Sequence, residues 1–551
     1  MKRILQPGVN CMGLYEVEST GLVVDGYDYY RFFYRAAKNA RRYILITGWQ
    51  FDSAFALLRG GEAEEAGGEV TMLRFLAGLC EDNPDLEIYI LAWDFIEFYL
   101  VKREWFQDRK FNRSACERLH FRFDSRHAVG ASHHEKFVVV DGELAFAGGL
   151  DLCSSRWDQR DHRLDNPLRR DRMGKHYEPY HDTQSCHTGP LARQLAEVFK
   201  VRWENSGGEK LDLPEPAGEA RREGFFTIPI SAREVAISRT RAKTIVPHQE
   251  SVQEIRSLYV DAVSAAERLI YIENQYFSSQ AVYKALVDRM RAPGRPKLQI
   301  IFVLPKRPHS LLEEVSLSFA QSKMLKNMID IASSEGHSLG IYYRVAGIKD
   351  GAGVPVHIHS KLLLVDDRFL TVGSANTTNR SMGLDTEINV AWEAHSEEQG
   401  ELRESLREVR LSLLREHTGL GEDEDHDLQV VEGLVERLEV LATSSRCRLR
   451  HHTLETLVEE GVLPSGIGLE DLKVDPETPI LEENIFELMA RDETGLFRKG
   501  VNLLGELLVY RRAELWKYLA HQWRRWWRAA VLALGLALLV AVILIFLVTG
   551  D

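Results

Sequence analysis

Residues 134–141 read His-Glu-Lys-Phe-Val-Val-Val-Asp, and the chain repeats this pattern 225 residues later as His-Ser-Lys-Leu-Leu-Leu-Val-Asp at residues 359–366. Each copy is followed, at matched spacing, by a pair of small residues and then by one polar residue. The same offset joins residues 49–51 to residues 274–276. A repeat that stays in register over about a hundred residues indicates an internal duplication.

The residue order predicts one β-hairpin in each copy. Four consecutive apolar residues after a polar start indicate a buried strand, and His and Lys at i and i+2 of a strand share one face. Asp141 and Gly142 predict a two-residue turn, and Asp141 and Asp366 are expected to be structural because they end the apolar runs. A second apolar run then returns to small residues, which are expected to let a substrate approach the backbone. These are Gly148, Gly149, Gly373 and Ser374.

The duplicated pattern of His-x-Lys-x4-Asp followed by small residues and a polar residue resembles the phospholipase D superfamily. The resemblance spans roughly residues 40–420, and because it occurs twice in register it is far more specific than one copy would be. Further matching segments lie in both halves: residues 149–152, 156–158, 180–182, 189–190, 272–277 and 379–381.

The residue types suit cleavage of a phosphodiester. One imidazole can attack phosphorus and form a covalent phosphohistidine, and a second can donate a proton to the leaving alcohol. Lysines and an amide can stabilise the charge on phosphate, so no metal and no cofactor are expected. Each hairpin supplies one His and one Lys, so we expect the site where the two halves meet. The expected catalytic residues are His134, Lys136, His359, Lys361 and Asn376.

The resemblance also implies particular roles. It implies that His134 is the nucleophile and His359 the general acid, and that Glu387 orients and charge-tunes a catalytic histidine. Asp158 is a weaker candidate for the same partner role. Where the family has an asparagine in the first copy, this chain has Asp151, so a direct contact of that carboxylate with phosphate is in doubt.

Composition restricts the class of substrate. The 551 residues carry a formal net charge of -13, whereas a protein that grips long nucleic acid normally shows an excess of basic residues. No nucleic-acid partner is therefore expected. The six cysteines are scattered without metal-like pairing, which indicates reduced thiols in a cytosolic compartment.

The C-terminal region predicts a membrane anchor. Residues 529–548 contain no charged residue and are long enough to span a hydrocarbon core. Arginines and tryptophans alternate in the preceding flank, residues 523–528, as is typical of a membrane interface. The arginine-rich flank predicts that the catalytic part faces the cytoplasm. The expected partners are a phospholipid and a membrane crossed once; the oligomeric state is left open.

The alternation of strands and helices predicts an α/β fold with two similar α/β/α halves, built of mixed β-sheets flanked by helices and related by a pseudo-two-fold axis. The predicted divisions are a first half at residues 1–215, a second half at 216–420, a helical region at 421–522 and the anchor at 523–551. Residues 158–180 are expected to form a polar surface loop, and residues 428–520 solvated helices without a catalytic constellation.

Three functions agree with these features. The first is a membrane-anchored phospholipase D that hydrolyses the distal phosphodiester of a glycerophospholipid to phosphatidic acid and an alcohol. The second is a phosphatidyl transferase of the cardiolipin-synthase type, which would share the first step but use an alcohol acceptor. The third is a nucleic-acid phosphodiesterase, which the negative net charge disfavours. Head-group specificity and the balance of hydrolysis against transphosphatidylation are left open.

Overall fold

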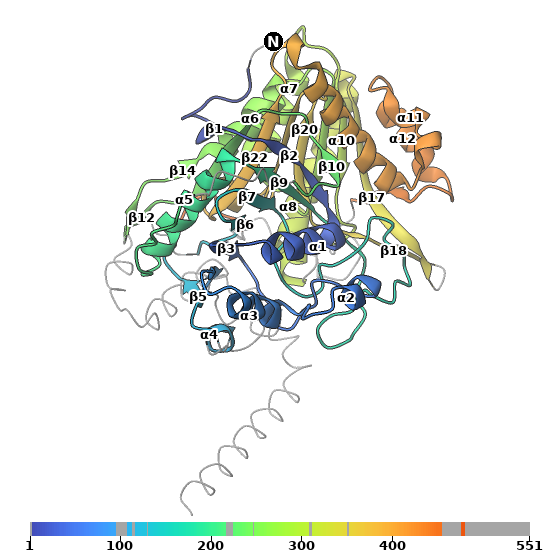
Figure 1. The fold of residues 1–551 in the computed structure, drawn as a ribbon. Coiled ribbons are helices and arrows are strands. Elements are labelled where there is room, and N and C mark those ends of the chain that lie inside the picture. The colour runs from blue at the N-terminus through green and yellow to red at the C-terminus, as the bar shows by residue number, and fades with distance from the viewer. Residues whose placement is uncertain are drawn as a thin grey trace, which may run out of the picture.

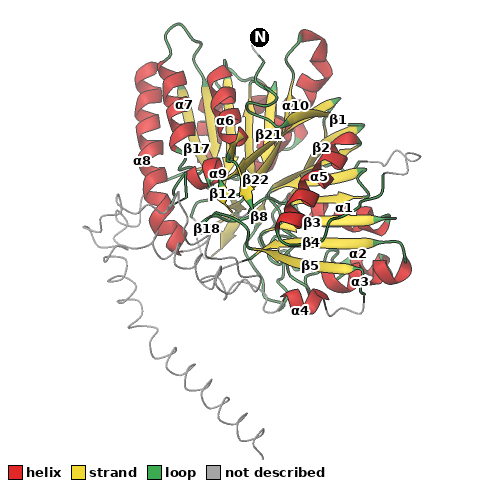
Figure 2. Ribbon diagram, turned by 90° about the vertical axis from the view of Figure 1, so that its left-hand side faces the viewer, coloured by secondary structure: helices red, strands yellow, loops and turns green. Residues whose placement is uncertain are grey.

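The computed structural model describes residues 3–94, 107–112, 116–128, 130–215, 224–245, 247–307, 311–349, 352–454 and 475–479. Two large mixed β-sheets form its centre, and helices cover them (Figures 1 and 2). The expected α/β class is confirmed.

The first sheet has the strand order β10-β2-β9-β7-β6-β3-β4-β5. Its strands β3, β4 and β5 are parallel neighbours, whereas the hairpin β6–β7 and strand β9 are antiparallel neighbours. The strands are β2 (Ser19–Val24), β3 (Tyr43–Gly48), β4 (Glu87–Trp93), β5 (Leu119–Asp124), β6 (Phe137–Val140), β7 (Leu144–Gly148), β9 (Thr183–Thr188) and β10 (Ile228–Pro229).

The second sheet repeats this order as β1-β11-β22-β21-β20-β15-β16-β17 and continues with β18. Strands β14 and β23 pair at its side with β11 and β17. The strands are β1 (Gly13–Glu16), β11 (Glu234–Arg241), β14 (Val252–Gln253), β15 (Leu269–Asn274), β16 (Gln299–Val303), β17 (Ser338–Lys349), β18 (Ala352–Pro355), β20 (Lys361–Val365), β21 (Phe369–Gly373), β22 (Glu387–Glu393) and β23 (Leu449–His451).

The two halves exchange their first strands. Strand β1 precedes β2 in the chain but pairs with β11 of the second sheet, and β10 precedes β11 but pairs with β2 of the first. The exchange is reciprocal, as a pseudo-two-fold relation between the halves requires. The division expected at residue 215 therefore does not separate the two sheets completely, because each sheet contains one strand from the other half of the chain.

Both sheets bury apolar side chains on both faces. In β3, Ile44 and Ile46 pack outward against α1 and α3, and Leu45 packs inward, toward the other half. In β15, Ile270 packs outward against α6, α7 and α8, which lie together along the second sheet (Figure 2). Helices α5, α10 and α12 join the inner core. These helices are α1 (Asp25–Lys38), α3 (Met72–Asp82), α5 (Pro190–Asn205), α6 (Glu254–Ala265), α7 (Gln280–Arg291), α8 (Leu311–Glu335), α10 (Gly400–Thr418) and α12 (Leu434–Thr443).

The remaining elements are short. Strand β8 pairs in parallel with β19 and so joins the two halves, and β12 pairs with β13. They are β8 (Tyr180–His181), β12 (Thr244–Ile245), β13 (His248–Gln249), β19 (His357–Ile358), α2 (Gly61–Glu65), α4 (Gln107–Asn112), α9 (Asn379–Gly383), α11 (His426–Gln429) and the 3-10 turns Glu397–Gln399 and Glu422–Glu424.

The two expected hairpins are present, but their turns are longer than expected. Val140 pairs with Leu144 and Val365 with Phe369, so each turn has three residues. Asp141 and Asp366 begin these turns with φ values of 53° and 56°, a left-handed conformation that aspartate tolerates better than most residues.

The hydrogen bonds of both turn aspartates agree with the structural role expected of them. The Asp141 carboxylate accepts hydrogen bonds from the backbone N–H groups of residues 41, 42 and 43, at 2.8–2.9 Å. Asp366 accepts from those of residues 267, 268 and 269, at 2.7–2.8 Å. Each carboxylate therefore fixes its hairpin to the start of the neighbouring strand, β3 or β15.

The region after α10 differs in part from the sequence expectation. Helix α12 packs into the core through Leu434 and Leu438, and residues 449–451 form strand β23 rather than a solvated helix. Among the described residues, no helix is long and apolar enough to cross a membrane. The expected anchor at residues 529–548 lies outside the described residues, as does most of the helical region expected at 421–522.

Candidate active site

His134 and His359 line the same cavity, which has a volume of about 1020 Å³. His134 lies three residues before β6, and His359 lies two residues before β20. The backbone N–H of His134 donates to the carbonyl of Thr386, and that of His359 donates to the carbonyl of His181. Each histidine is thus held by the backbone of the other half, so the site forms where the halves meet, as expected.

A buried carboxylate orients each imidazole. Nδ1 of His134 lies 3.0 Å from Oε2 of Glu387, and Nδ1 of His359 lies 2.5 Å from Oδ2 of Asp182. Because Nδ1–H donates to the carboxylate, Nε2 is the free nitrogen of each neutral ring. The pairs cross between the halves, and the role expected of Glu387 agrees with this geometry.

Asp182, and not Asp158, is the carboxylate that pairs with His359. Asp158 is fully buried and accepts hydrogen bonds from His162, Arg169 and the backbone of Tyr180. Burial alone would raise the pKa of Asp158, but the hydrogen bond from His162 and the charges of His162 and Arg169 outweigh it and hold that pKa below its usual value. The expected partner role of Asp158 is therefore wrong.

Strand register shows that Asp182 and Glu387 are equivalent. Gly148 pairs with Gln184, and Gly373 pairs with Asn389, so each carboxylate lies two residues before the residue that faces the glycine. The offset between the halves drops from 225 to 205 here, because the connection before Asp182 is 20 residues longer than that before Glu387. A comparison of the two halves at a constant offset of 225 residues does not align Asp182 with Glu387. The sequence signal that could have identified Asp182 is its position directly before the buried strand β9.

The two lysines lie beneath the histidines. Lys136 Nζ donates to the carbonyl of His134 at 2.8 Å, and Lys361 Nζ donates to the carbonyl of His359. Lys361 also lies 3.4 Å from Oε1 of Gln275, a contact that the sequence analysis did not identify. Burial lowers the pKa of Lys361 to about 7, opposed by Asp182.

Burial and the lysines lower the pKa values of both histidines. Burial and the charges of Lys136 and Lys361 hold the pKa of His134 well below its usual value. Burial and the charge of Lys361 have the same effect on the pKa of His359. Burial raises the pKa of Glu387 to about 7, partly opposed by the hydroxyl group of Ser374. A neutral His134 with a free Nε2 is a competent nucleophile.

The polar residues after the hairpins have different surroundings. Asp151 Oδ1 accepts from the backbone N–H of Trp49 at 2.7 Å, and its Oδ2 lies 3.7 Å from Lys136 Nζ. Asp151 therefore neutralises a lysine and binds the backbone. Asn376 lines the cavity, and its buried Oδ1 has no hydrogen-bond partner among the described residues. That oxygen is available as an acceptor for a bound group.

The small residues make room for protein rather than for substrate. A Cβ on Gly148 would lie 1.8 Å from the Gln184 side chain, and one on Gly149 would lie 2.2 Å from the Asp182 carboxylate. A Cβ on Gly373 would lie 2.1 Å from the side chain of Asn389. The expectation of close substrate approach is therefore replaced by close packing against β9, β22 and the Asp182 carboxylate.

Two family models match the chain. The model described as Phospholipase D matches residues 36–290, and the model described as Cardiolipin synthase, PLD-like domain, matches residues 259–409. Together they include both hairpins, both histidines and both lysines.

Several curated proteins are similar over most of the chain. Phospholipase D alpha 2 of Oryza sativa subsp. japonica is 25% identical over 523 residues, which cover 70% of this chain and 63% of that protein. Phospholipase D alpha 4 of Arabidopsis thaliana is 24% identical over 515 residues, covering 73% and 66%. The chain thus spans just under two thirds of the length of these relatives. A solved phosphatidylserine synthase of Haemophilus influenzae Rd KW20 is 12% identical, with a TM-score of 0.47, over 78% of this chain and 94% of that one.

Proposed function

We propose that this chain, which carries phospholipase D superfamily domains over both halves, hydrolyses the distal phosphodiester of a glycerophospholipid to phosphatidic acid and an alcohol. The enzyme class, a phosphodiesterase or transphosphatidylase of this superfamily, agrees with the family matches and with relatives named phospholipase D. The observation that carries the proposal is the pair of histidines on one cavity, each oriented by a carboxylate from the opposite half.

The first step is a displacement at phosphorus. Nε2 of His134 attacks and the bond from phosphorus to the head-group oxygen breaks. His359 enters this step as the imidazolium, because the Asp182 carboxylate and the bound phosphodiester anion favour a second ring proton on Nε2, and it donates that proton to the leaving oxygen. Lys136 and Lys361 offset the charge on the phosphoryl oxygens, and the Nδ2 group of Asn376, which lines the cavity, donates a hydrogen bond to them. Glu387 stabilises the positive charge that develops on the His134 ring.

The second step reverses the geometry. His359, which lost its proton to the leaving alcohol, takes a proton from an incoming water molecule. The resulting oxygen attacks phosphorus, the bond to His134 breaks, and phosphatidic acid leaves. An alcohol in place of water gives a phosphatidyl alcohol by the same step.

Transfer to an alcohol is the second candidate function. The match of residues 259–409 to a model described as Cardiolipin synthase, PLD-like domain, supports it. The chemistry of the two functions differs only in the group that attacks the phosphohistidine, so the same residues serve both.

A lipid panel with product analysis by mass tests the proposal. Vesicles of single phospholipids are incubated with the protein, with and without added ethanol, and compared with a His134→Asn variant. Phosphatidic acid alone supports hydrolysis, and a phosphatidyl alcohol in preference to phosphatidic acid supports transfer. Cleavage of an oligonucleotide with no lipid product would overturn both.

Anchoring of the site at a membrane also belongs to the proposal. Residues 529–548 and the arginine-rich flank before them support one C-terminal span with residues 1 to about 520 on the cytoplasmic face. Protease protection in sealed vesicles tests this orientation. Protection of the catalytic part from protease added on the cytoplasmic side would contradict it.

A further inference from the structure

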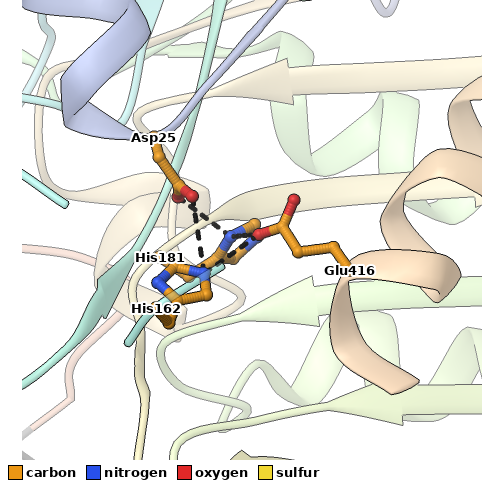
Figure 3. A group of neighbouring side chains, drawn as sticks. All are labelled: Asp25, His162, His181 and Glu416. Atoms are coloured by element: carbon orange, nitrogen blue, oxygen red, sulfur yellow. Dashed lines mark hydrogen bonds and ion pairs between the residues drawn. The ribbon is translucent and has the colours of Figure 1, made fainter. Parts of the chain in front are cut away.

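A second cluster of chemically active side chains lies behind the catalytic carboxylate Asp182. It consists of Asp25, His162, His181 and Glu416, whose side chains are 0–1% exposed. Figure 3 shows the four side chains converging on one point. They come from the start of α1, the long connection after β7, strand β8 and the end of α10. The described lining of the catalytic cavity includes none of them.

The spacing of the donor atoms fits one small cation. One ligand atom from each residue lies within 4.8 Å of all the others. Nε2 of His162 lies 3.4 Å from Oδ2 of Asp25 and 3.1 Å from Oε1 of Glu416. Nδ1 of His181 lies 3.0 Å from Oδ1 of Asp25 and 2.6 Å from Oε1 of Glu416. A tetrahedral site with bonds of about 2.0–2.2 Å places its donor atoms about 3.3–3.6 Å apart. A bound ion would therefore move Nδ1 of His181 and Oε1 of Glu416, now 2.6 Å apart, away from each other by roughly 0.7–1 Å.

In each imidazole, the ring nitrogen that points away from the cluster contacts a carboxylate, as is usual for a histidine that binds a metal. Nδ1 of His162 lies 3.0 Å from the Asp158 carboxylate, and Nε2 of His181 lies 2.9 Å from the Glu273 carboxylate. A histidine that binds a metal usually donates its other N–H to a carboxylate or carbonyl, which fixes the tautomer and the ring. Here both rings have that arrangement, with the inner nitrogens turned to the same point. This explains why Asp158 is buried although it does not contact the catalytic histidines.

Two inner atoms lack hydrogen bonds. Oδ2 of Asp25 and Nδ1 of His181 are buried and lie within ion-pair distance of other members of the cluster, but neither makes a hydrogen bond within the described part of the chain. Buried polar atoms are nearly always hydrogen-bonded, so such a pair at one point indicates a ligand held between them. The two oxygens of Glu416 also have different partners. Oε2 accepts a hydrogen bond from Arg160 at 2.6 Å, and Oε1 faces the two imidazole rings.

The neighbouring group of His181, Glu273 and His417 does not fit a cation. Both oxygens of Glu273 are occupied: Oε1 accepts from Tyr271 and His417, and Oε2 accepts from His181 and Ser360. These four partners use the lone pairs of the carboxylate. Glu273 therefore supports His181 rather than binding a metal.

We propose that Asp25, His162, His181 and Glu416 bind one divalent cation of the zinc class. Two imidazoles and two carboxylates suit such a cation, and four protein ligands without an open position describe a structural site. Two guanidinium groups contact Glu416: Arg160 lies 2.6 Å from Oε2, and Arg344 lies 3.7 Å from Oε1 and also donates to the carbonyl groups of residues 160 and 161.

The cation joins the two halves beside the catalytic site. Glu416 belongs to the second half, whereas the other three ligands belong to the first. His181 directly precedes Asp182, and its carbonyl accepts from the backbone N–H of His359. The metal therefore fixes the segment that positions His359. The sequence analysis expected no metal, because the ligands at 25, 162, 181 and 416 have no recognisable spacing.

Metal content provides the test. The purified full-length chain is incubated with zinc alone, dialysed, and analysed by mass spectrometry for metal per chain. We expect one equivalent in the wild type and in His187→Asn, which changes a buried histidine outside the cluster. We expect loss of that equivalent in His162→Asn and in Glu416→Gln. A wild type that retains no zinc would overturn the proposal, as would folded variants that retain the full equivalent.

A spectroscopic measurement on the wild type covers the case in which the variants do not fold. Zinc X-ray absorption is expected to show four nitrogen or oxygen neighbours, two of them with imidazole multiple scattering. Sulfur neighbours, or a first shell without imidazole, would overturn the proposal. Loss of the metal by prolonged chelation is expected to lower the unfolding temperature of the wild type and leave that of the two ligand variants unchanged; an unchanged wild type would contradict the structural role.

Discussion

The two histidine–carboxylate pairs occupy equivalent positions in the two halves, yet their surroundings differ. Glu387 accepts from two hydroxyl groups, those of Ser374 and Ser381, and its histidine, His134, is 17% exposed. Asp182 accepts the backbone N–H of Thr183, and its histidine, His359, is 6% exposed. The two equivalent sites therefore differ in exposure: the imidazole of His134 is the more accessible, and that of His359 is the more enclosed.

This difference agrees with unequal roles. A nucleophile must reach phosphorus, so the more accessible His134 suits attack, and the hydroxyl groups on Glu387 stabilise its negative charge opposite the ring that becomes cationic. A general acid only has to transfer a proton to the leaving oxygen. The more enclosed His359 can therefore serve as the acid. Each prediction below tests whether the pairs differ in this way.

The largest expected effect separates the two histidines. His134→Asn and His359→Asn should each reduce turnover of a phosphatidyl alcohol by about 10³-fold or more, because each removes an essential group. With phosphatidyl-p-nitrophenol, whose leaving group needs no proton, His359→Asn should release nitrophenol in a burst and retain the phosphatidyl group on His134. His134→Asn should show neither. Stopped-flow absorbance and peptide mapping after rapid quenching measure both.

The same experiment can reverse the assignment. A burst in His134→Asn, with the phosphatidyl group on His359, would exchange the two roles. The absence of a phosphorylated histidine in the wild type and in both variants would contradict the covalent mechanism itself.

The next effect tests the corrected partner of His359. Asp182→Asn should lower kcat by about 10²-fold or more, because the amide no longer holds the imidazole with its proton on Nδ1. The nitrophenyl substrate should restore most of that loss, since Asp182 acts through the acid. Asp158→Asn, which changes a buried carboxylate outside the cavity, should lower kcat by less than about tenfold when normalised to folded protein. Equal losses in the two variants would argue against the pairing of Asp182 with His359.

A pH profile gives a smaller effect. The pKa of Glu387 is raised to about 7, so protonation of this carboxylate below that pH should remove the charge that supports the His134 cation. The pKa of Lys361 is lowered to about 7, so its charge should be lost above that pH. We therefore expect kcat/KM to be bell-shaped with a narrow maximum near neutrality, falling about tenfold per pH unit on either side.

Lys361→Arg provides the matched control for the alkaline side. Arginine stays charged throughout this range, so the alkaline limb should move upward or disappear while the acid limb remains. A broad plateau from pH 5 to about 9 in the wild type would contradict the perturbed pKa values of both groups.

The smallest expected effect concerns the turn aspartates Asp141 and Asp366, which make the same hydrogen bonds in both halves. Asp141→Asn and Asp366→Asn should each lower the free energy of unfolding by about 1–3 kcal/mol, because an amide cannot accept all three backbone N–H groups. Activity per folded molecule should be nearly unchanged. Chemical denaturation followed by fluorescence measures the loss. A kinetic defect without a loss of stability would give these aspartates a catalytic role instead.

Local patterns predicted the two hairpins. Consecutive apolar residues after a polar start identified strands β6 and β20. The hydrogen bonds of the turn aspartates agree with the structural role expected from their place after the apolar runs. These features depend on contacts between residues that are near in the chain or repeat in register.

The errors occurred where the duplication changes length. Residues 158–180 read as a polar surface loop, but His162 and Arg169 are buried in it and satisfied by carboxylates. The segment is polar, but it was wrong to infer from this that it lies at the surface. A segment whose charged side chains are buried in ion pairs has the same composition as a solvated loop. The strand exchange through β1 and β10 likewise has no sequence signature.

The sequence by itself determined the duplication, the two His-Lys hairpins and the roles of Asp141 and Asp366. Only the tertiary structure assigned Asp182 to His359, exchanged the first strands, and gathered Asp25, His162, His181 and Glu416 at one point. The physical reason is the range of the interactions. Strand and turn preferences are set by neighbouring residues, whereas these pairs are formed by the docking of two sheets, and a 20-residue difference in one connection shifts their spacing without changing their geometry.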